Sequence, residues 1–443
     1  MAASRELFDV AQRCIDLARA QGAAEVAARA YKTRDVTVQW RDGKLEQINE
    51  ATTRGASLQL YVDGRYSAAQ SSDLRPDALA RFVADAVAMT RSLAPDPHRS
   101  LPDPSLYGNR PAADLQIDDP AYAGVSPEKR RAVAQALEAG ARGVKGADAI
   151  LSVTGGVNDT RSETVRVHSN GFRGERVDTQ FWSYASVSVK DADGRRPEDG
   201  AYAGVRFVGE LPEAETVGRL SAERAIARLG AKKAASAQLP MVLENRTAGR
   251  LAGFLGQPLS ARALQQKQSF LEGKLGQAVG SEKMTVTDDP LLPRGFGSRH
   301  FDAEGISARR LPIFEKGVLR NCYVDTYYGK KLGMAPTTGS TSNLAWAKGD
   351  KDRDGLIAEV QDGILVTGFI GGNSNATTGD FSLGVQGFRI RGGKLAEAVA
   401  EMNIAGNHLE LWKRLSAVGN DPYPYSPLRT PTLVFDGVQF AGL

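Results

Sequence analysis

The stretch that most constrains the fold covers residues 371–407 and reads GGNSNATTGDFSLGVQGFRIRGGKLAEAVAEMNIAGN. It opens with a loop of residues that favour unusual backbone angles, namely Gly371, Gly372, Asn373, Asn375 and Gly379. Residues 381–390 have the pattern of a strand, and a turn at Gly392 and Gly393 leads to a second extended segment. Glycines inside strands indicate a second backbone packed closely against them. The stretch therefore predicts a domain rich in strands.

The chain has 443 residues, which is longer than one ordinary domain, so two or three domains are expected. In the first half, a helical pattern, a meander of short alternating strands and a second helical pattern follow one another twice. The fold class is therefore α+β, with two helix–β-meander–helix units that are related by duplication or share one sheet. The expected domains are an N-terminal α+β unit at 1–94, a proline-rich surface linker at 95–125, a central α+β unit at 126–231 and a C-terminal β-rich domain with few helices at 237–443.

Composition excludes several classes of protein. A net charge of +4 from 56 basic and 52 acidic residues is too balanced for a dedicated nucleic-acid binder. Cys14 and Cys322 lie far apart and suggest no disulfide framework, which fits a reducing compartment. The first turns carry charges, unlike a signal peptide, and no apolar run approaches the ~20 residues of a membrane helix. We expect a cytoplasmic protein with neither nucleic acid nor membrane as a partner.

Several segments resemble a known protein family. They are TGDFS at 378–382, the Gly-Gly-Lys turn, MNIAGN at 402–407, DDP at 288–290 and GSRHFDAEG at 297–305. Over essentially its whole length the chain resembles the TldE (PmbA) type of subunit in the TldD/TldE protease family, whose older label is modulator of DNA gyrase. One departure is Arg391-Gly392-Gly393, where the family usually has Glu-Asn-Gly.

The resemblance implies where a zinc site would lie. The zinc-bearing TldD subunits have a His-Glu-x-x-x-His helix and a later cysteine as third ligand. Here the helix-like segment 247–266, which a proline should break, places Gly253, Phe254 and Pro258 at those positions, and Val418 takes the place of the cysteine. None of these side chains can ligate zinc or act as a base. We therefore predict no cofactor in this chain and zinc in a partner subunit.

The resemblance also implies a function. It predicts the non-catalytic, non-zinc subunit of a heterodimeric metalloprotease, which holds unfolded peptides or leader peptides for cleavage by a TldD-like partner. Whether the chain alone counts as an enzyme stays open, and the isolated chain can form a homodimer. The candidates for peptide binding or for the interface are Gly371, Gly372, Asn373, Asn375, Gly379, Asp380, Phe381 and Ser382.

Two other functions stay open at this point. A stand-alone metal hydrolase would use His300, Asp302 and Glu304, which alternate and would share one face of a strand. A regulatory protein would bind peptides or proteins without any protease role.

Two further motifs are incomplete. Asp350, Asp352 and Asp354 imitate the first half of a calcium loop, but the twelfth position is Gln361, which cannot supply a bidentate carboxylate. Calcium binding by these three carboxylates stays open. A serine nucleophile lacks a Gly-x-Ser-x-Gly elbow, and the sequence predicts no histidine base near the polar loops at 339–342 and 373–375.

Overall fold

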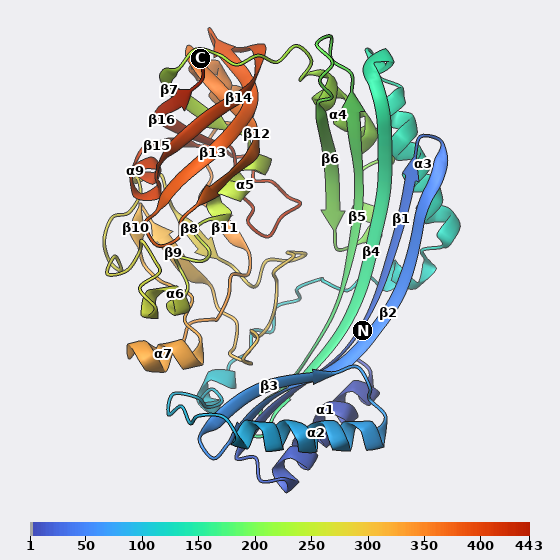
Figure 1. The fold of residues 1–443 in the computed structure, drawn as a ribbon, viewed down its shortest axis with the longest axis vertical. Coiled ribbons are helices and arrows are strands. Elements are labelled where there is room, and N and C mark those ends of the chain that lie inside the picture. The colour runs from blue at the N-terminus through green and yellow to red at the C-terminus, as the bar shows by residue number, and fades with distance from the viewer. Residues whose placement is uncertain (1–2) are drawn as a thin grey trace.

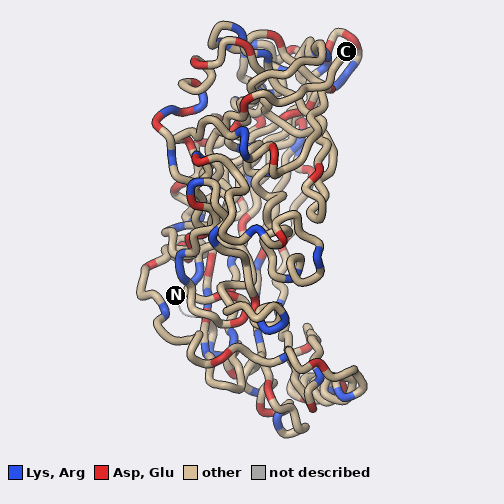
Figure 2. Tube along the Cα trace, turned by 90° about the vertical axis from the view of Figure 1, so that its left-hand side faces the viewer, with Lys and Arg blue, Asp and Glu red and all other residues tan. Residues whose placement is uncertain are grey.

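The computed structural model describes residues 3–443. A long curved sheet with its helices forms one side of the molecule, and a strand-rich C-terminal domain stands beside it (Figure 1). The α+β class and the β-rich C-terminal domain are thereby confirmed. Acidic and basic residues are interspersed along the trace (Figure 2). No helix among residues 3–443 is long and apolar enough to cross a membrane.

The N-terminal half is built on one antiparallel sheet with the order β3-β2-β1-β4-β5-β6. Its strands are β1 (Glu25–Arg41), β2 (Lys44–Val62), β3 (Arg65–Ser71), β4 (Ile150–His168), β5 (Arg173–Val189) and β6 (Glu198–Val205). The central strands β1 and β4 pair from Ala27 and His168 to Arg41 and Thr154. Because this pairing joins the first three strands to the last three, the two halves of the sheet share one surface.

Four helices cover one face of this sheet. They are α1 (Arg5–Ala20), α2 (Pro76–Arg91), α3 (Pro127–Arg142) and α4 (Ala214–Ile226). Alternate residues of β1 face them: Val26 and Ala28 pack in the cluster under α1 and α2, and Val38 packs under α3 and α4. The intervening residues are mostly polar and line the opposite face, toward the C-terminal domain. The alternation of apolar and polar residues along the strands thus determines which face of the sheet the helices leave uncovered.

The proline-rich segment contains no strand, only the 3₁₀ turns η1 (Pro104–Tyr107) and η2 (Pro120–Gly124). It is anchored at both sides. The amide of Thr179 in the sheet donates to Ile117 O at 2.8 Å, and the amide of Arg294 in the C-terminal domain donates to Leu115 O at 2.8 Å. The linker therefore ties the two sides of the molecule together as well as connecting successive units.

The C-terminal domain holds a six-stranded sheet with the order β14-β13-β12-β7-β16-β15, and an extra pairing of β14 with β16 makes it barrel-like. Its strands are β7 (Ala237–Leu243), β12 (Asp362–Ser374), β13 (Asp380–Arg391), β14 (Lys394–Asn407), β15 (Leu415–Val418) and β16 (Leu433–Ala441). A smaller sheet contains β8 (Val286–Asp288), β9 (Leu311–Glu315), β10 (Val318–Leu319) and β11 (Leu344–Trp346). The two sheets share one large apolar core.

The helices of this domain are short: α5 (Asn245–Gly253), α6 (Ala261–Gln265), α7 (Thr326–Leu332), α8 (Arg353–Glu359) and α9 (His408–Lys413). The helix-like segment predicted over 247–266 is two helices, α5 and α6, with Pro258 in the interruption between them. This is the expected effect of proline, which removes a backbone donor and clashes with the preceding turn.

Candidate functional site

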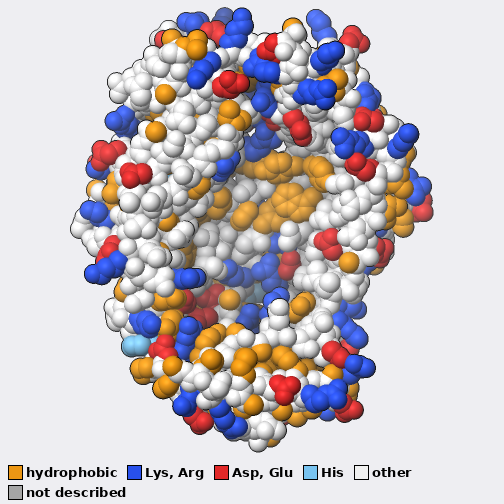
Figure 3. Space-filling model, in the orientation of Figure 1, with side chains coloured by type: hydrophobic (Ala, Val, Ile, Leu, Met, Phe, Trp, Pro, Cys, Tyr) orange, Lys and Arg blue, Asp and Glu red, His pale blue; other side chains and the backbone are white. Residues whose placement is uncertain are grey.

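A hollow lies between the sheet and the C-terminal domain (Figure 3). Its wall on the sheet side is the face of β1, β4 and β5 that the helices leave free. Side chains on this wall bond to one another: Thr160 Oγ1 donates to Asp35 at 2.7 Å, and the hydroxyls of Thr33 and Ser162 lie 2.9 Å apart. This part of the wall is therefore polar, and its groups are already partly satisfied before any ligand binds.

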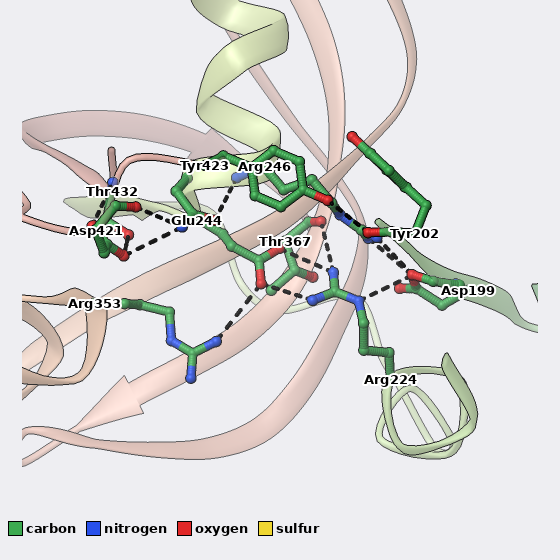
Figure 4. A network of polar contacts seen from close by, with 12 residues as sticks. Asp199, Tyr202, Arg224, Glu244, Arg246, Arg353, Thr367, Asp421, Tyr423 and Thr432 are labelled. Atoms are coloured by element: carbon green, nitrogen blue, oxygen red, sulfur yellow. Dashed lines mark hydrogen bonds and ion pairs between the residues drawn. The ribbon is translucent and has the colours of Figure 1, made fainter. Parts of the chain in front are cut away.

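Charged side chains from β6, α4 and the C-terminal domain form a clasp between the two sides of the molecule (Figure 4). The Arg224 guanidinium of α4 donates to both carboxylate oxygens of Glu244, at 2.7 and 3.0 Å, and to Asp199 of β6 at 3.2 Å. Arg246 of α5 also donates to Asp199, at 3.1 Å. Burial alone would raise the pKa of Asp199, but the two guanidinium groups hold it below its ordinary value. The charges are thus paired in a nearly buried cluster.

A second clasp lies where the linker meets α7. The Arg99 guanidinium carbon lies 4.2 Å from the ring centre of Tyr66 in β3 and 3.4 Å from that of Tyr327 in α7. The Tyr327 hydroxyl donates to Asp96 at 2.7 Å. Stacking of a guanidinium between two aromatic faces is favourable because the ring faces carry negative charge. The hollow is therefore bordered by contacts that tie the C-terminal domain to both ends of the sheet.

The glycine-rich loop has the backbone that its sequence predicts, because Gly371, Gly372 and Gly379 have φ of 94°, 103° and 85°. Part of the predicted site lines one pocket beside this loop, formed by Gln257, Asn373, Ser374, Asn375, Ala376, Thr377, Asp380, Phe381 and Ser382. Gly379 is buried instead: a Cβ there would lie 3.1 Å from both Asn407 and Phe270. Of the eight predicted residues, the pocket brings together Asn373, Asn375, Asp380, Phe381 and Ser382. The three predicted glycines shape the backbone around it.

His408 lies beside Ser374, so the expectation that no histidine approaches this loop is wrong. Its Nε2 lies 2.8 Å from Ser374 Oγ, and its Nδ1 has no hydrogen-bond partner among residues 3–443. The ring packs against Phe254, Phe270 and Phe381, and burial lowers the pKa of His408 to about 4. A histidine without an orienting carboxylate and with so low a pKa is a weak general base at neutral pH. The pair therefore anchors the loop.

His300, Asp302 and Glu304 do not share a strand face, and they bind three different partners. His300 Nδ1 lies 3.1 Å from Pro111 O, Asp302 accepts the amides of Glu304 and Ile306, and Glu304 accepts the amide and hydroxyl of Thr326. The alternation prediction fails because residues 302–305 form a turn. Among residues 3–443 there is no group of three or more His, Cys, Asp and Glu side chains placed to hold a metal ion.

The four residues that the resemblance assigns to a zinc site offer no ligand atoms in their side chains. Gly253 ends α5, Phe254 follows it and packs on His408, and Pro258 is buried beyond the helix. Val418 ends β15 and is buried. Glycine has no side chain beyond a hydrogen, and the aromatic, pyrrolidine and isopropyl groups of the other three have no lone pair to give a metal, so these residues do not fit zinc.

The acidic run at 350–354 has a local structural role at one position. Asp352 is the N-cap of α8, and its carboxylate accepts the amide of Gly355 at 2.9 Å.

Sequence reasoning missed the residues that line the hollow. Trp182 and Tyr184 alternate along β5 and therefore lie on one face, opposite glycines of the neighbouring strands. Aromatic residues two apart in one strand, facing glycines in the next, are a signal that could have found them once the pairing of strands was known.

Comparison with known proteins assigns the family. Three models of the PmbA/TldA metallopeptidase match this chain: domain 1 at residues 26–90, the central domain at 121–229 and the C-terminal domain at 236–442. The chain is 29% identical over 426 residues to Metalloprotease PmbA of Escherichia coli O157:H7, a match that covers 95% of this chain and 92% of that protein.

Solved structures agree. A candidate modulator of DNA gyrase from Bacteroides thetaiotaomicron is 39% identical, with a TM-score of 0.96 over 99% of this chain and 100% of that one. TldE from Thermococcus kodakarensis shares the fold, with a TM-score of 0.85 at 19% identity over 98% of this chain and 100% of that one. The protein therefore belongs to the PmbA/TldA metallopeptidase family, the TldD/TldE family that its sequence resembles.

Proposed function

We propose that this chain is the non-zinc subunit of a heterodimeric, cytoplasmic metalloprotease, and that it holds unfolded peptides or leader peptides for cleavage by a zinc-bearing TldD-like partner. One combination carries the proposal: all three domains of the family are present, while the residues that the resemblance places at the ligand and base positions of a zinc subunit are Gly253, Phe254, Pro258 and Val418. Zinc-dependent hydrolysis needs a metal-bound water and a nearby base, and neither can come from these side chains.

The surfaces of the chain support a holding role. The pocket beside the glycine-rich loop is lined by amides and hydroxyls such as Asn373, Asn375 and Ser382. Such groups can both donate and accept, so they can bond to a peptide backbone whatever its side chains are. An extended peptide that binds mainly through its backbone is recognised with little dependence on sequence. This suits a subunit that receives unfolded chains.

A subunit that works only in a complex needs a permanent interface. Interfaces of permanent complexes usually bury more than ~2,000 Å² in total and are more apolar than transient ones. We expect the C-terminal domain to supply most of this interface. Without its partner, the isolated chain can use the same surface to form a homodimer.

The test is a peptidase assay with three arms: this chain, a family member from the same organism that carries His-Glu-x-x-x-His, and the two mixed. An unstructured fluorogenic peptide is the substrate, and the chelator 1,10-phenanthroline is added in parallel. We expect cleavage only in the mixture, abolished by the chelator.

Each contrary outcome has a distinct meaning. Chelator-sensitive cleavage by this chain alone would refute the assignment as a non-zinc subunit. Full activity of the partner alone would refute the required-subunit claim and favour a regulatory peptide-binding role.

A further inference from the structure

Hydrophobic side chains line part of the hollow (Figure 3). A pocket on the face of the sheet that the helices leave free is lined by Asn158, Trp182, Tyr184, Ala185, Asp199, Gly200, Ala201, Tyr202 and Arg246. Its volume of about 520 Å³ lies within the ~300–1,000 Å³ usual for small-ligand sites. We use "aromatic platform" for Trp182, Tyr184 and Tyr202. All three side chains are partly exposed.

The backbone beneath the platform is built to let two of these rings lie over neighbouring strands. Tyr184 pairs with Gly156 of β4, and Trp182 pairs with Gly204 of β6. A Cβ at Gly156 would lie 2.3 Å from the Tyr184 ring, and one at Gly204 would lie 2.3 Å from the Trp182 ring. Any larger residue would push the rings away. The glycines therefore keep the ring faces turned toward the hollow.

Contacts within the protein show that other aromatic rings pack against the platform. Phe296, from a loop of the C-terminal domain, stacks on Trp182 with ring centres 4.9 Å apart and an angle of 20°. Tyr202 makes an edge contact with Tyr423, at 5.5 Å and 82°. Tyr184 is the member of the platform without a ring partner of this kind among the described residues, although its hydroxyl accepts a bond from Gln39 at 2.7 Å.

Charge around the pocket distinguishes between possible ligands. An aromatic surface attracts cations, but a cation in this pocket would find no free carboxylate, because Asp199 is already paired with Arg224 and Arg246. A neutral ring needs no counter-charge and gains both burial and stacking.

We infer that the aromatic platform binds an aromatic side chain of an unfolded peptide, with Tyr184 as its main contact. This inference rests on the proposed peptide-holding function and adds to it a preference among side chains. The backbone contacts of a bound peptide would give general affinity, and the platform would favour segments with Phe, Tyr or Trp at one position.

The test measures peptide affinity of the purified full chain by fluorescence anisotropy. Two labelled, unstructured peptides are compared that differ only in a central Phe or Ala. The wild type should bind the Phe peptide about tenfold more tightly, the size expected for burying and stacking one ring. Tyr184→Ala should reduce this preference to less than about twofold. Tyr184→Thr, which keeps a residue suited to a strand, should do the same.

Tyr31 offers a matched control. It lies on the same face of the sheet and packs over Gly55, where a Cβ would lie 2.7 Å from its hydroxyl, but it does not line the pocket. Tyr31→Ala should leave the Phe preference unchanged.

Four outcomes separate this inference from the proposed function. Loss of the preference in the Tyr184 variants alone supports the platform. Equal binding of both peptides to the wild type overturns the platform and leaves the holding role standing. Equal loss in Tyr31→Ala and the Tyr184 variants also overturns it. Failure of the wild type to bind either peptide overturns the holding role together with this inference.

Discussion

Glu304 is half-buried where the C-terminal domain meets the sheet. Burial is the main cause that raises its pKa, the carboxylates of Asp302 and Asp325 add to it, and the hydrogen bonds from Thr326 partly oppose it. The result is a pKa of about 7 instead of 4.5. Because the folded chain favours the protonated acid, the stabilising contribution is complete below pH 4.5 and is lost as pH rises through about 7. Ionisation of Glu304 at alkaline pH therefore lowers the free energy of unfolding.

We therefore predict that Glu304→Gln stabilises the protein at high pH. Gln keeps an oxygen that can accept from Thr326 and carries no charge. The midpoint of thermal unfolding should be a few degrees higher than that of the wild type at pH 8, and equal to it near pH 4.5. Glu272→Gln, at an exposed position of the same domain, is the control and should show no such dependence. A lower midpoint for Glu304→Gln at pH 8 would show that its charge is needed.

At the scale of elements, α3 and α4 cross with almost no space between them. A Cβ at Gly218 would lie 1.9 Å from the carbonyl oxygen of Leu137, and one at Gly140 would lie 2.2 Å from that of Glu215. The two glycines therefore fix how closely these helices approach on the back of the sheet.

Gly218→Ala should destabilise the protein by roughly 1–3 kcal/mol, the usual cost of forcing extra volume into a packed contact. The better helix propensity of alanine, worth at most ~1 kcal/mol, opposes this only in part. Gly209→Ala is the matched control, because a Cβ there has nothing within 4 Å. Chemical denaturation of both variants measures the difference. Equal free energies of unfolding for the two variants would mean that α3 and α4 can move apart to make room for the extra methyl group at no cost.

The sequence predicted individual helices and strands better than the contacts between them. The strand expected at 381–390 is β13 (Asp380–Arg391), and the break expected at Pro258 separates α5 from α6, because periodicity and proline are local signals. Contacts between distant segments have no local signal. The approach of His408 to Ser374 and the pairing of Tyr184 with Gly156 depend on which strands become neighbours. For this reason the glycine-rich loop could be predicted and the aromatic platform could not.

At the scale of the whole molecule, the charged clasp holds the sheet and the C-terminal domain together. Arg224 bridges Glu244 and Asp199, which belong to different sides of the hollow. Arg224→Ala leaves two nearly buried carboxylates short of a partner, so it should cost about 3 kcal/mol. Arg219→Ala removes an exposed pair with Glu223 on the same helix and should cost less than about 0.5 kcal/mol. Denaturant unfolding of both variants tests this, and equal costs would show that the clasp does not hold the two sides together.

The central claim is that this chain keeps the fold of its family without the means to bind catalytic zinc. Elemental analysis of the purified chain tests it most directly, after incubation with zinc and removal of the free metal by gel filtration. A family member with His-Glu-x-x-x-His, treated in the same way, is the positive control and should retain about one zinc per chain. Because Gly253, Phe254, Pro258 and Val418 cannot ligate the metal, this chain should retain far less than one. One tightly bound zinc per chain would contradict the account.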